Sequence, residues 1–507
     1  MLPEFPFSGT GSLPEELIED LNLISENART DQVMSIIEPS LVDLGYELVR
    51  VHFGGGHKPI LQIMFDRIDG EEVTIDDCTL ASRQDWTLGQ MEEWYLFPDL
   101  LDRTVSAGNF SSVQGYIDAL VAPARAQDRD RYFTYLTSIA EENALISSGS
   151  NAGFGVRLGY DTAARRVFVV EAFENAPAFA QGIDRGSEII AIGGQTVTAL
   201  MAEGGAQAVV NALGPSDPGV TRQLRIRQPG GGEVTVGVTK TEYALDPISD
   251  RYGAKILDNG GTKVGYINLR TFIIDDAKAQ LRDAFTVFRA EGVTQIILDF
   301  RYNGGGLVSV AELLGDLLAA DRTGQVFSKT TFRDSKSDFN EIARFAAAPQ
   351  AIAATRIAVI GTVGTASASE LVANAFIPIL GDNIALIGTD TYGKPVGQIA
   401  RDRSACDDRL RVVAFRSVNA DDGGDYYSGL ASVMPQTCRA GDDILTPLGD
   451  PGEALIATAL DFLAGRSCTA IGAAAEGIAE SRAAPAKREL VMPQAPSPAQ
   501  IEIPGLQ

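Results

Sequence analysis

The chain has 507 residues, of which 45% are apolar and 21% are charged, so its composition is that of a globular protein and excludes global disorder. At roughly 100–200 residues per domain, this length predicts three or four domains. The net charge of −25 disfavours binding to nucleic acid or anionic lipid, because both expose negative phosphate groups.

Histidines and cysteines limit the possible chemistry further. His52 and His57 are the only two histidines, so the rest of the chain has no Ser-His-Asp triad, Cys-His pair or histidine-rich zinc site. The four cysteines are too few for a disulfide-dense scaffold or a zinc ribbon, and none forms a Cys-x-x-Cys pair. One structural bridge is possible, and it would indicate an oxidising compartment.

The N-terminal half is predicted to contain four segments. Residues 1–30 lack the basic start and apolar core of a secretory signal, so we expect a linker or leader. In residues 31–83 the pattern predicts a helix and two strands, at 47–53 and 60–65, joined by a glycine-rich turn. Residues 84–149 are predicted to be helical, and 150–242 to be a β-rich module with a helix near 199–213.

Alternating strands and helices in residues 243–465 predict an α/β core. The expected strands are 264–272, 294–300, 356–361, 385–388 and 410–415, and the expected helices are 275–292, 307–318 and 367–377. No run of 18 apolar residues suggests a membrane span. Residues 466–507 have few large apolar side chains, so we expect a disordered tail.

Three features of the α/β core suggest chemistry. Ser367 stands where a strand leads through small residues into a helix, and amides at a helix start favour a developing oxyanion, although serine is also an ordinary N-cap. Asn303 and three glycines follow a buried strand and could bring backbone amides to a ligand, or simply form a tight turn. Lys394 lies in a Gly- and Pro-punctuated loop, with Gln398 four residues on.

Lys394 acts as a general base only if desolvation lowers its pKa, and a solvated surface lysine is the alternative. Because histidine is absent from this part of the chain, a Ser/Lys dyad is the remaining route to an activated serine.

The motifs TASASE, GKPVGQ and DFRYNGGG together resemble the S41 family of C-terminal processing peptidases over about residues 84–465. The resemblance implies a ClpP/crotonase-like α/β core, with Ser367 as nucleophile, Lys394 as base and Gln398 orienting the lysine. It also implies oxyanion donors at the amide of Ala368 and at that of Gly305 or Gly306, without a cofactor or metal. Tyr392, Pro395 and Gly304 depart from the usual family residues, but none of these changes removes a reacting group.

Two further resemblances concern the regions before the core. A short loop near the start of the predicted β-rich module, Gly153, Phe154, Gly155 and Val156, is similar to the carboxylate-binding loop of a PDZ domain. This resemblance implies that the loop binds the C-terminus of a peptide. The alternative is that the Gly-Phe-Gly sequence forms an ordinary turn without a binding role. Residues 31–83 resemble a truncated N-terminal domain of RimP, the ribosome maturation factor. A fusion upstream of a peptidase or a chance match both explain this second resemblance.

The leading hypothesis is therefore a serine endopeptidase that cleaves proteins or peptides with exposed C-termini. The alternatives are a non-catalytic PDZ scaffold and a ribosome-associated factor. The family resemblance implies a periplasmic or other extracytoplasmic location, although no secretory signal is visible. We expect Cys406 and Cys438 to pair, because they bracket one irregular segment of about 33 residues, while two separate thiols remain the alternative.

Overall fold

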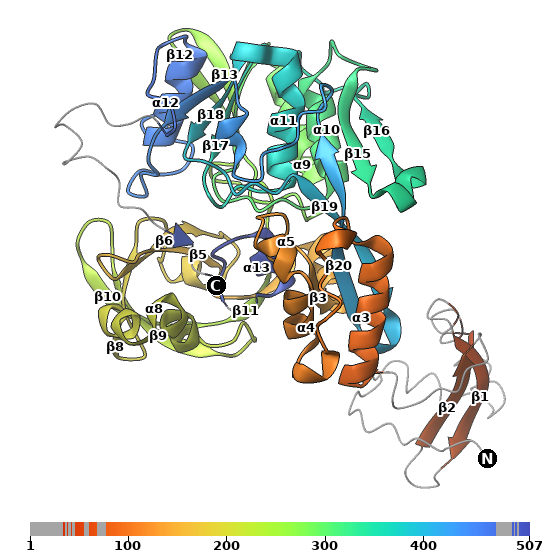
Figure 1. The fold of residues 1–507 in the computed structure, drawn as a ribbon. Coiled ribbons are helices and arrows are strands. Elements are labelled where there is room, and N and C mark those ends of the chain that lie inside the picture. Colours follow the sequence, from red (N-terminus) through yellow and green to blue (C-terminus); the bar gives the residue numbers. More distant parts are fainter. Residues whose placement is uncertain are drawn as a thin grey trace.

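In the computed structural model of the chain, the described residues are 34–35, 38, 42, 46–54, 60–67, 78–472, 489–490, 492–493 and 496–507. They form a hairpin, a helical region, a β-rich module and an α/β core in chain order, and the C-terminal residues return to lie among the last three (Figure 1). The predicted mixed α/β multidomain architecture is confirmed. The predicted leader, residues 1–30, lies outside the described residues.

The hairpin consists of β1 (Tyr46–Gly54) and β2 (Ile60–Arg67). The two strands are antiparallel, and their register runs from Tyr46 opposite Arg67 to Gly54 opposite Ile60. Both strands predicted in this segment are therefore confirmed. The hairpin projects beside the helical region, away from the other parts (Figure 1).

The helical region contains four helices and one strand: α3 (Leu80–Trp94), α4 (Val113–Leu120), α5 (Ala122–Arg125), β3 (Tyr135–Ser138) and α6 (Ile139–Ser148). Helix α3 begins at the N-cap Thr79 and continues across the boundary predicted between residues 83 and 84. That boundary is wrong, because α3 is one continuous helix. Its first turn is attached to the core through a bidentate ion pair between Arg83 and Asp408, at 2.5 and 2.6 Å.

The β-rich module contains β4 (Ser150–Gly153), β5 (Val156–Asp161), β6 (Arg166–Ala172), α7 (Pro177–Ala180), β7 (Glu188–Ile192), β8 (Gln195–Thr196), α8 (Val197–Leu213), β9 (Thr221–Arg227), β10 (Glu233–Thr239) and β11 (Thr241–Ala244). Strands β10, β9, β7, β6 and β5 form an antiparallel sheet in that order. Apolar side chains of this sheet and of α8 share one core. The predicted helix near 199–213 is confirmed.

The α/β core is built on a six-stranded sheet in the order β12 (Ala254–Asn259), β13 (Thr262–Asn268), β14 (Gln295–Asp299), β17 (Arg356–Gly361), β18 (Ile384–Gly388) and β21 (Gln436–Arg439). All neighbours are parallel except β12 and β13. Three helices, α9 (Ala277–Ala290), α10 (Val308–Leu318) and α11 (Ala368–Leu380), pack on one face, and α12 (Ala454–Leu463) packs on the other. Covering both faces explains the nearly continuous apolar strands.

A second sheet joins the core to the helical region. It contains β16 (Glu341–Arg344), β15 (Val326–Phe332), β20 (Asp408–Val418) and β19 (Val396–Arg403), and β3 pairs with the free part of β20. Only part of β20 was predicted. The other strands escaped prediction because they carry charged and polar residues and obtain their stability from this pairing.

The C-terminal residues contradict the predicted disordered tail. The short strand β22 (Glu489–Leu490) pairs with β5, and α13 (Pro498–Glu502) precedes three residues that also pair with β5. Composition misled the prediction because two of the few large apolar residues of this segment, Ile503 and Leu506, are almost completely buried against other parts of the chain.

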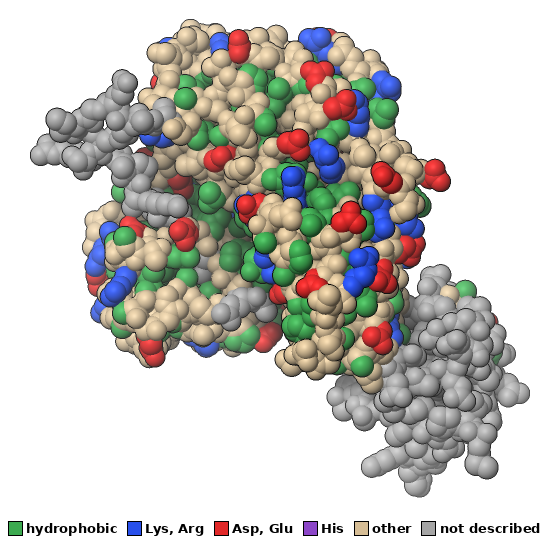
Figure 2. Space-filling model, viewed as in Figure 1, with side chains coloured by type: hydrophobic (Ala, Val, Ile, Leu, Met, Phe, Trp, Pro, Cys, Tyr) green, Lys and Arg blue, Asp and Glu red, His purple; other side chains and the backbone are tan. Residues whose placement is uncertain are grey.

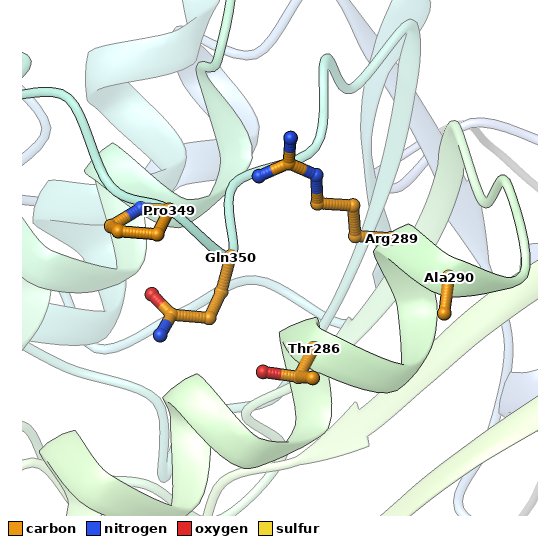
Figure 3. Close-up of a pocket in the computed structure, with 5 residues that line it drawn as sticks. All are labelled: Thr286, Arg289, Ala290, Pro349 and Gln350. Carbon is orange, nitrogen blue, oxygen red and sulfur yellow. The ribbon is translucent and has the colours of Figure 1, made fainter.

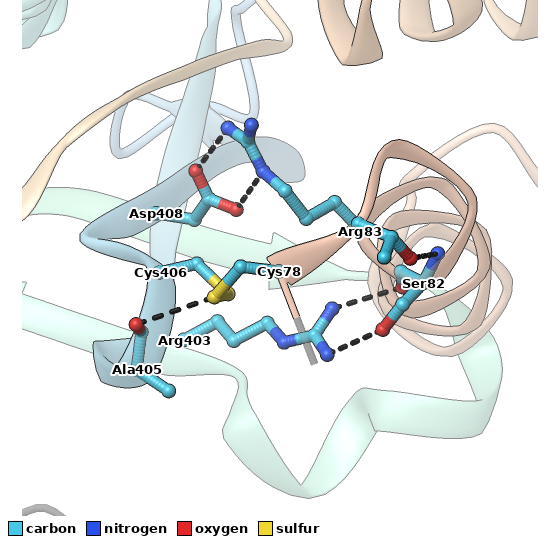
Figure 4. Close-up of a disulfide and its surroundings, with 8 residues drawn as sticks. Cys78, Ser82, Arg83, Arg403, Ala405, Cys406 and Asp408 are labelled. Carbon is cyan, nitrogen blue, oxygen red and sulfur yellow. Dashed lines mark hydrogen bonds and ion pairs between the residues drawn. A yellow bond between two sulfur atoms is a disulfide. The ribbon is translucent and has the colours of Figure 1, made fainter. Parts of the chain in front are cut away.

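Two disulfides join Cys78 to Cys406 and Cys438 to Cys468, so the predicted Cys406–Cys438 pair is wrong. Cys438 lies at the end of β21 in the six-stranded sheet, whereas Cys406 lies in the β19–β20 turn of the other sheet. The segment after α12 returns beside β21, where Arg439 N donates to Thr469 O at 2.7 Å. Figure 4 shows the Cys78–Cys406 bridge beside the Arg83–Asp408 ion pair.

Candidate active site

Ser367 is the N-cap of α11 and has φ +54° and ψ −115°, a backbone conformation that non-glycine residues rarely adopt. Two hydrogen bonds to the loop that follows β14 hold the turn before Ser367 in place. Thr365 Oγ1 donates to Phe300 O at 2.6 Å, and Ala366 N donates to Asn303 O at 3.0 Å. Ser367 remains partly exposed between buried neighbours. The predicted helix start is confirmed, and the turn presents the serine to the outside.

The glycine loop after β14 packs directly against this serine. A Cβ built on Gly305 would lie 2.7 Å from Ser367 Cβ and 3.1 Å from Ala368 N, and Gly305 has φ +115°. Only glycine can therefore bring this backbone so close. The Gly305 N–H donates to Asn303 Oδ1 at 2.9 Å, whereas the part of the chain that the structure describes offers no recorded acceptor for Gly306 N–H.

Lys394 lies between β18 and β19 and is only 8% exposed. Its Nζ donates to Gln398 Oε1 at 2.9 Å and lies 5.1 Å from the centroid of the Phe133 ring. Gln398 Nε2 in turn donates to Phe133 O. Burial lowers the pKa of the Lys394 amine, while the nearby carboxylates of Glu502 and Asp130 act in the opposite direction.

Glu370 links the serine turn to the lysine loop, and the sequence reasoning missed it. Its fully buried carboxylate accepts hydrogen bonds from Ser367 N at 3.0 Å and from Lys394 N at 2.7 Å. Gly393 N and Thr391 Oγ1 donate to the same carboxylate at 2.7 and 2.6 Å. Burial raises the pKa of Glu370 to about 7 against the effect of these hydrogen bonds.

A sequence signal for Glu370 was present. Ser367 and Glu370 have the Ser-x-x-Glu spacing of a capping box, in which the glutamate bonds back to the N-cap amide. Its additional contacts with the lysine loop depend on tertiary structure. Among the described residues, no hydrogen bond joins the Ser367 hydroxyl directly to the Lys394 amine, so Glu370 provides the recorded connection between their backbones.

The structure also brings the C-terminal segment to this site, which nothing in the sequence indicated. Gly304 N donates to Glu502 O at 3.1 Å. A Cβ on Gly304 would lie 2.9 Å from the same oxygen, so the two backbones are in close contact. The predicted carboxylate loop contacts the same C-terminal segment at a later residue, Gln507. Gly155 N and Val156 N donate to Gln507 O at 3.0 and 3.4 Å.

The other two residues of the predicted carboxylate loop, Gly153 and Phe154, have different surroundings. A Cβ on Gly153 would lie 3.1 Å from the carbonyl carbon of Gln507, so this glycine also admits the C-terminus. Phe154 is buried in the core of the module, with Lys240 Nζ 4.7 Å from its ring centroid. The backbone of Gly153, Gly155 and Val156 therefore contacts Gln507, whereas the Phe154 side chain anchors the loop in the core of the module.

One surface cavity lies apart from the predicted site residues. An open cavity of about 470 Å³ lies beside α9 and contains none of the predicted site residues (Figure 3). It is lined by Thr286, Arg289, Ala290, Pro349 and Gln350. Acidic and basic side chains are interspersed over the face shown in Figure 2, so the net negative charge does not gather into one acidic patch there.

No helix in the described parts of the chain has both the length and the apolar character needed to cross a bilayer.

Comparison with known families gives two matches. Residues 263–424 match peptidase family S41, and residues 36–85 match the RimP N-terminal domain. The first match includes Gly305, Ser367, Glu370, Lys394 and Gln398. The second match includes β1, β2 and the first turns of α3.

Individual relatives agree with the first match. A carboxyl-terminal-processing protease from Picosynechococcus sp. is 28% identical over 348 residues, which cover 62% of this chain and 78% of that protein. A chloroplastic C-terminal processing peptidase from Tetradesmus obliquus is 31% identical over 283 residues, which cover 51% of this chain and 54% of that protein. The chain thus spans about half the length of the algal relative.

A solved structure shows the same fold. The crystal structure of a protein from Bacteroides fragilis that is assigned to the S41 proteases superimposes with a TM-score of 0.59 at 23% identity. The superposition covers 75% of this chain and 97% of that protein.

Proposed function

Since this chain carries a peptidase family S41 domain and is a serine-type protease, we propose that Ser367 is its nucleophile and Lys394 its general base. Gln398 is a positioning residue that holds the Lys394 amine through a hydrogen bond of 2.9 Å. The amides of Ala368 and Gly306 serve as the oxyanion donors, because the Gly305 amide is already bonded to Asn303. Gly305 allows this loop to approach the serine.

The reaction is acyl transfer to serine followed by hydrolysis. Neutral Lys394 Nζ accepts the Ser367 hydroxyl proton while Oγ attacks the peptide carbonyl carbon, and the two amides stabilise the tetrahedral oxyanion. The protonated amine then gives its proton to the leaving nitrogen as the C–N bond breaks. Water, deprotonated by the same lysine, hydrolyses the acyl ester and releases Ser367.

The observation that carries this proposal is the desolvated Lys394 amine on a loop tied to the serine turn by Glu370. A solvated lysine would stay protonated at neutral pH and could not accept the serine proton. A buried lysine with a lowered pKa is poised for this role, and histidine is absent from this part of the sequence.

Labelling with a fluorophosphonate probe tests the nucleophile. The wild-type chain is expected to react, and Ser367→Ala to lose both labelling and protein cleavage while its thermal unfolding midpoint is retained. Removing a serine nucleophile costs on the order of 10⁴–10⁶ in rate. The exposed Ser432 provides the matched control, since Ser432→Ala should label like wild type. Undiminished labelling of Ser367→Ala would exclude this assignment.

We also propose that residues 150–242 act as a PDZ-type module that captures substrates by an exposed C-terminus. Support comes from β5, which is the outermost strand of the module's own sheet, from helix α8, which packs on that sheet, and from the amides of Gly155 and Val156, which donate to Gln507 O. Strand addition to such an edge provides affinity, and the loop amides select a free carboxylate.

An extracytoplasmic location, such as the periplasm, completes the proposal. Two disulfides support it, because such bridges persist in oxidising compartments and are rare in the cytosol. Mapping the bridges in protein isolated from its native cells under thiol-blocking conditions tests this location. Finding all four cysteines reduced there would contradict it.

A further inference from the structure

The loop that we propose to bind carboxylates is already occupied by residues 505–507 of the same chain. Gln507 O accepts from Gly155 N and Val156 N, and Gln507 N donates to Val156 O at 2.9 Å. Leu158 N donates to Gly505 O at 2.8 Å, and Leu506 lies opposite Arg157 in an antiparallel bridge. The last three residues therefore add a short strand to the edge of β5, which is how an extended peptide augments a sheet.

Apolar side chains of the segment are buried as well. Ala499, Ile503 and Leu506 are buried in one cluster that also contains residues from the helical region, the module and the α/β core. The cluster partners are Leu145, Phe173, Ala176, Tyr243, Leu245, Ile273 and Ile274. Figure 1 places α13 where these three parts meet. Residues 498–507 thus occupy the junction between the parts of the enzyme.

The same segment crosses the proposed active site. Glu502 O accepts from Gly304 N, in the loop that adjoins Ser367, and the Glu502 carboxylate is buried close enough to Lys394 to influence its charge. Arg157 provides a second connection between the C-terminal segment and the loop that adjoins Ser367. Its buried guanidinium donates to Pro504 O at 3.2 Å and to Tyr302 O, immediately before the Asn303 turn.

The conformation of the segment at this point is not that of an extended substrate. Ile501 N donates to Ser497 O at 3.0 Å and Ile503 N to Ala499 O at 2.8 Å, so these peptide groups are bonded within helix α13 and its end. The Glu502 carbonyl is bonded to Gly304 instead of to the amides that we assign to the oxyanion. The segment therefore lies beside the proposed site, with these peptide groups already hydrogen-bonded within the segment or to Gly304.

We propose that residues 496–507 are an intramolecular ligand that occupies the carboxylate loop and closes the active site, so that a substrate must displace this segment to be cleaved. The inference rests on the proposed peptidase function for its activity measurements, whereas its binding measurements do not depend on catalysis. The proposed carboxylate loop and the apolar site of Leu506 together indicate the class of competing ligand: a peptide with a free carboxylate and an apolar residue immediately before its last residue.

Tethering makes such a ligand effective even when its intrinsic affinity is modest. A micromolar dissociation constant and an effective concentration in the millimolar range leave about one site in a thousand free. Removal of the segment is therefore expected to raise kcat/KM for an unfolded protein substrate by about tenfold to a thousandfold.

The first experiment compares cleavage of unfolded casein by the full chain, a chain ending at Ala495 and full-length Leu506→Asp. The point substitution keeps the segment but places a charge in the apolar cluster, so it remains informative if the truncated chain does not fold. Leu445→Asp is the matched control because Leu445 is 67% exposed. The truncated chain and Leu506→Asp should be activated, and Leu445→Asp should match wild type.

The second experiment measures binding in trans. A synthetic peptide of residues 496–507 is titrated by calorimetry into the truncated chain carrying Ser367→Ala, which cannot consume the peptide. The free-acid peptide is expected to bind with micromolar affinity and the C-terminally amidated peptide at least about tenfold more weakly. The free-acid peptide should also restore inhibition of the catalytically active truncated chain. The same peptide should bind full-length Leu506→Asp with higher apparent affinity than it binds the full-length wild type, because the tethered segment of the variant competes less strongly for the site.

Three results would overturn the inference: wild-type activity in both folded tail variants, equal affinity of the free-acid and amidated peptides, or Ser367-dependent removal of the segment from the full chain by mass spectrometry. Failure of the proposed function looks different. In that case fluorophosphonate labelling and cleavage are absent from every variant, while the free-acid peptide still binds in preference to the amidated one.

Discussion

At the residue scale, burial determines how Lys394 differs from the other lysines of the core. Its amine has one recorded polar side-chain partner, Gln398, and a nearby aromatic ring, whereas Lys329 forms an exposed ion pair with Asp422. The neutral form of a lysine is favoured by desolvation and disfavoured by neighbouring carboxylates, and desolvation is the larger effect at Lys394. Chemical function here follows from surroundings that no local sequence pattern specifies.

The pH dependence of kcat/KM should follow the titration of Lys394. Because the base must be neutral, the rate should rise with pH and level off above a pKa that is lower than that of an exposed lysine. Lys394→Arg should be inactive at every pH, since guanidinium stays protonated. Lys329→Arg serves as the control and should keep the wild-type profile. An active Lys394→Arg variant would show that another group accepts the proton.

Glu370 should contribute a distinct pH dependence to stability. Burial raises its pKa in the folded chain to about 7, so the folded state binds a proton more tightly than the unfolded state does. The favourable contribution is therefore present below the ordinary carboxyl pKa and is lost as pH rises through about 7. Relative to Glu370→Gln, the wild-type free energy of unfolding should fall by up to about 3 kcal/mol across this range.

Denaturant unfolding of both chains at several pH values measures this difference. Glu291→Gln provides the control, because Glu291 forms an exposed ion pair with Lys263 and its replacement should leave the profile unchanged. Glu370→Gln should also lose activity, since an amide cannot accept all the donors from both loops. Parallel wild-type and Glu370→Gln stability profiles would contradict the assigned pKa.

At the scale of elements, apolar patterning predicted β13, β14, β17 and β18 of the six-stranded sheet, because both faces of that sheet are covered by helices, but it did not predict β12 or β21. It also did not predict β15, β16 or β19, which carry many polar and charged residues. Of these, β15 pairs with β20 from a distant part of the chain, β16 pairs with β15, and β19 pairs with β20. It also did not predict α13, which is five residues long and depends on contacts with three other parts. Short elements of this kind have too little local signal to be recognised.

The glycine loop offers a prediction about how closely two elements must pack. Gly305→Ala would introduce a Cβ 2.7 Å from Ser367 Cβ at a backbone φ of +115°, so the serine turn must shift. Because displacement of a reacting group by about 1 Å costs on the order of 10²-fold in rate, kcat/KM should fall by at least that factor. Steady-state kinetics on a peptide substrate provide the measurement.

Gly324→Ala is the matched control for this substitution. Gly324 also has a positive φ, +85°, but a Cβ there would meet nothing within 4 Å. The control should lose some stability through backbone strain and keep its catalytic efficiency. Comparable losses of kcat/KM in the two variants would mean that strain alone, and not the approach to Ser367, explains the effect.

At the scale of the whole molecule, covalent links connect distant parts. The Cys78–Cys406 bridge attaches the segment before α3 to the β19–β20 turn, 328 residues away, and Cys438–Cys468 attaches the segment after α12 to β21. Cys78 lies within the residues that match the RimP N-terminal domain, 36–85, whereas Cys406 lies within those that match peptidase family S41. In this chain the end of that match is therefore part of the peptidase structure.

Peptide mapping without reduction should recover Cys78–Cys406 and Cys438–Cys468. Thiol counting on the denatured, unreduced chain should find no free thiol. The Cys438–Cys468 bridge closes a loop of 30 residues, so replacing both cysteines with serine should lower the free energy of unfolding by about 3–4 kcal/mol in the chain-entropy model. Recovery of a Cys406–Cys438 peptide would contradict this connectivity.

The sequence alone was sufficient to predict the alternating α/β core, the order of its parts and the residue types available for catalysis. Apolar periodicity and small-residue turns are local properties, and a lack of histidine limits the chemistry wherever the chain folds. The positions of Ser367, the glycine loop and Lys394 at strand ends were therefore recognisable before any contact was known.

Only the tertiary structure decided how Glu370 connects the serine turn to the lysine loop, which cysteines pair and where residues 496–507 lie. Each of these depends on residues that are distant in sequence and meet because their burial or hydrogen bonding is satisfied jointly. Composition predicted a disordered tail, since Ile503 and Leu506 are isolated apolar residues along the chain. They become buried because the module, the helical region and the core together form the site that receives them.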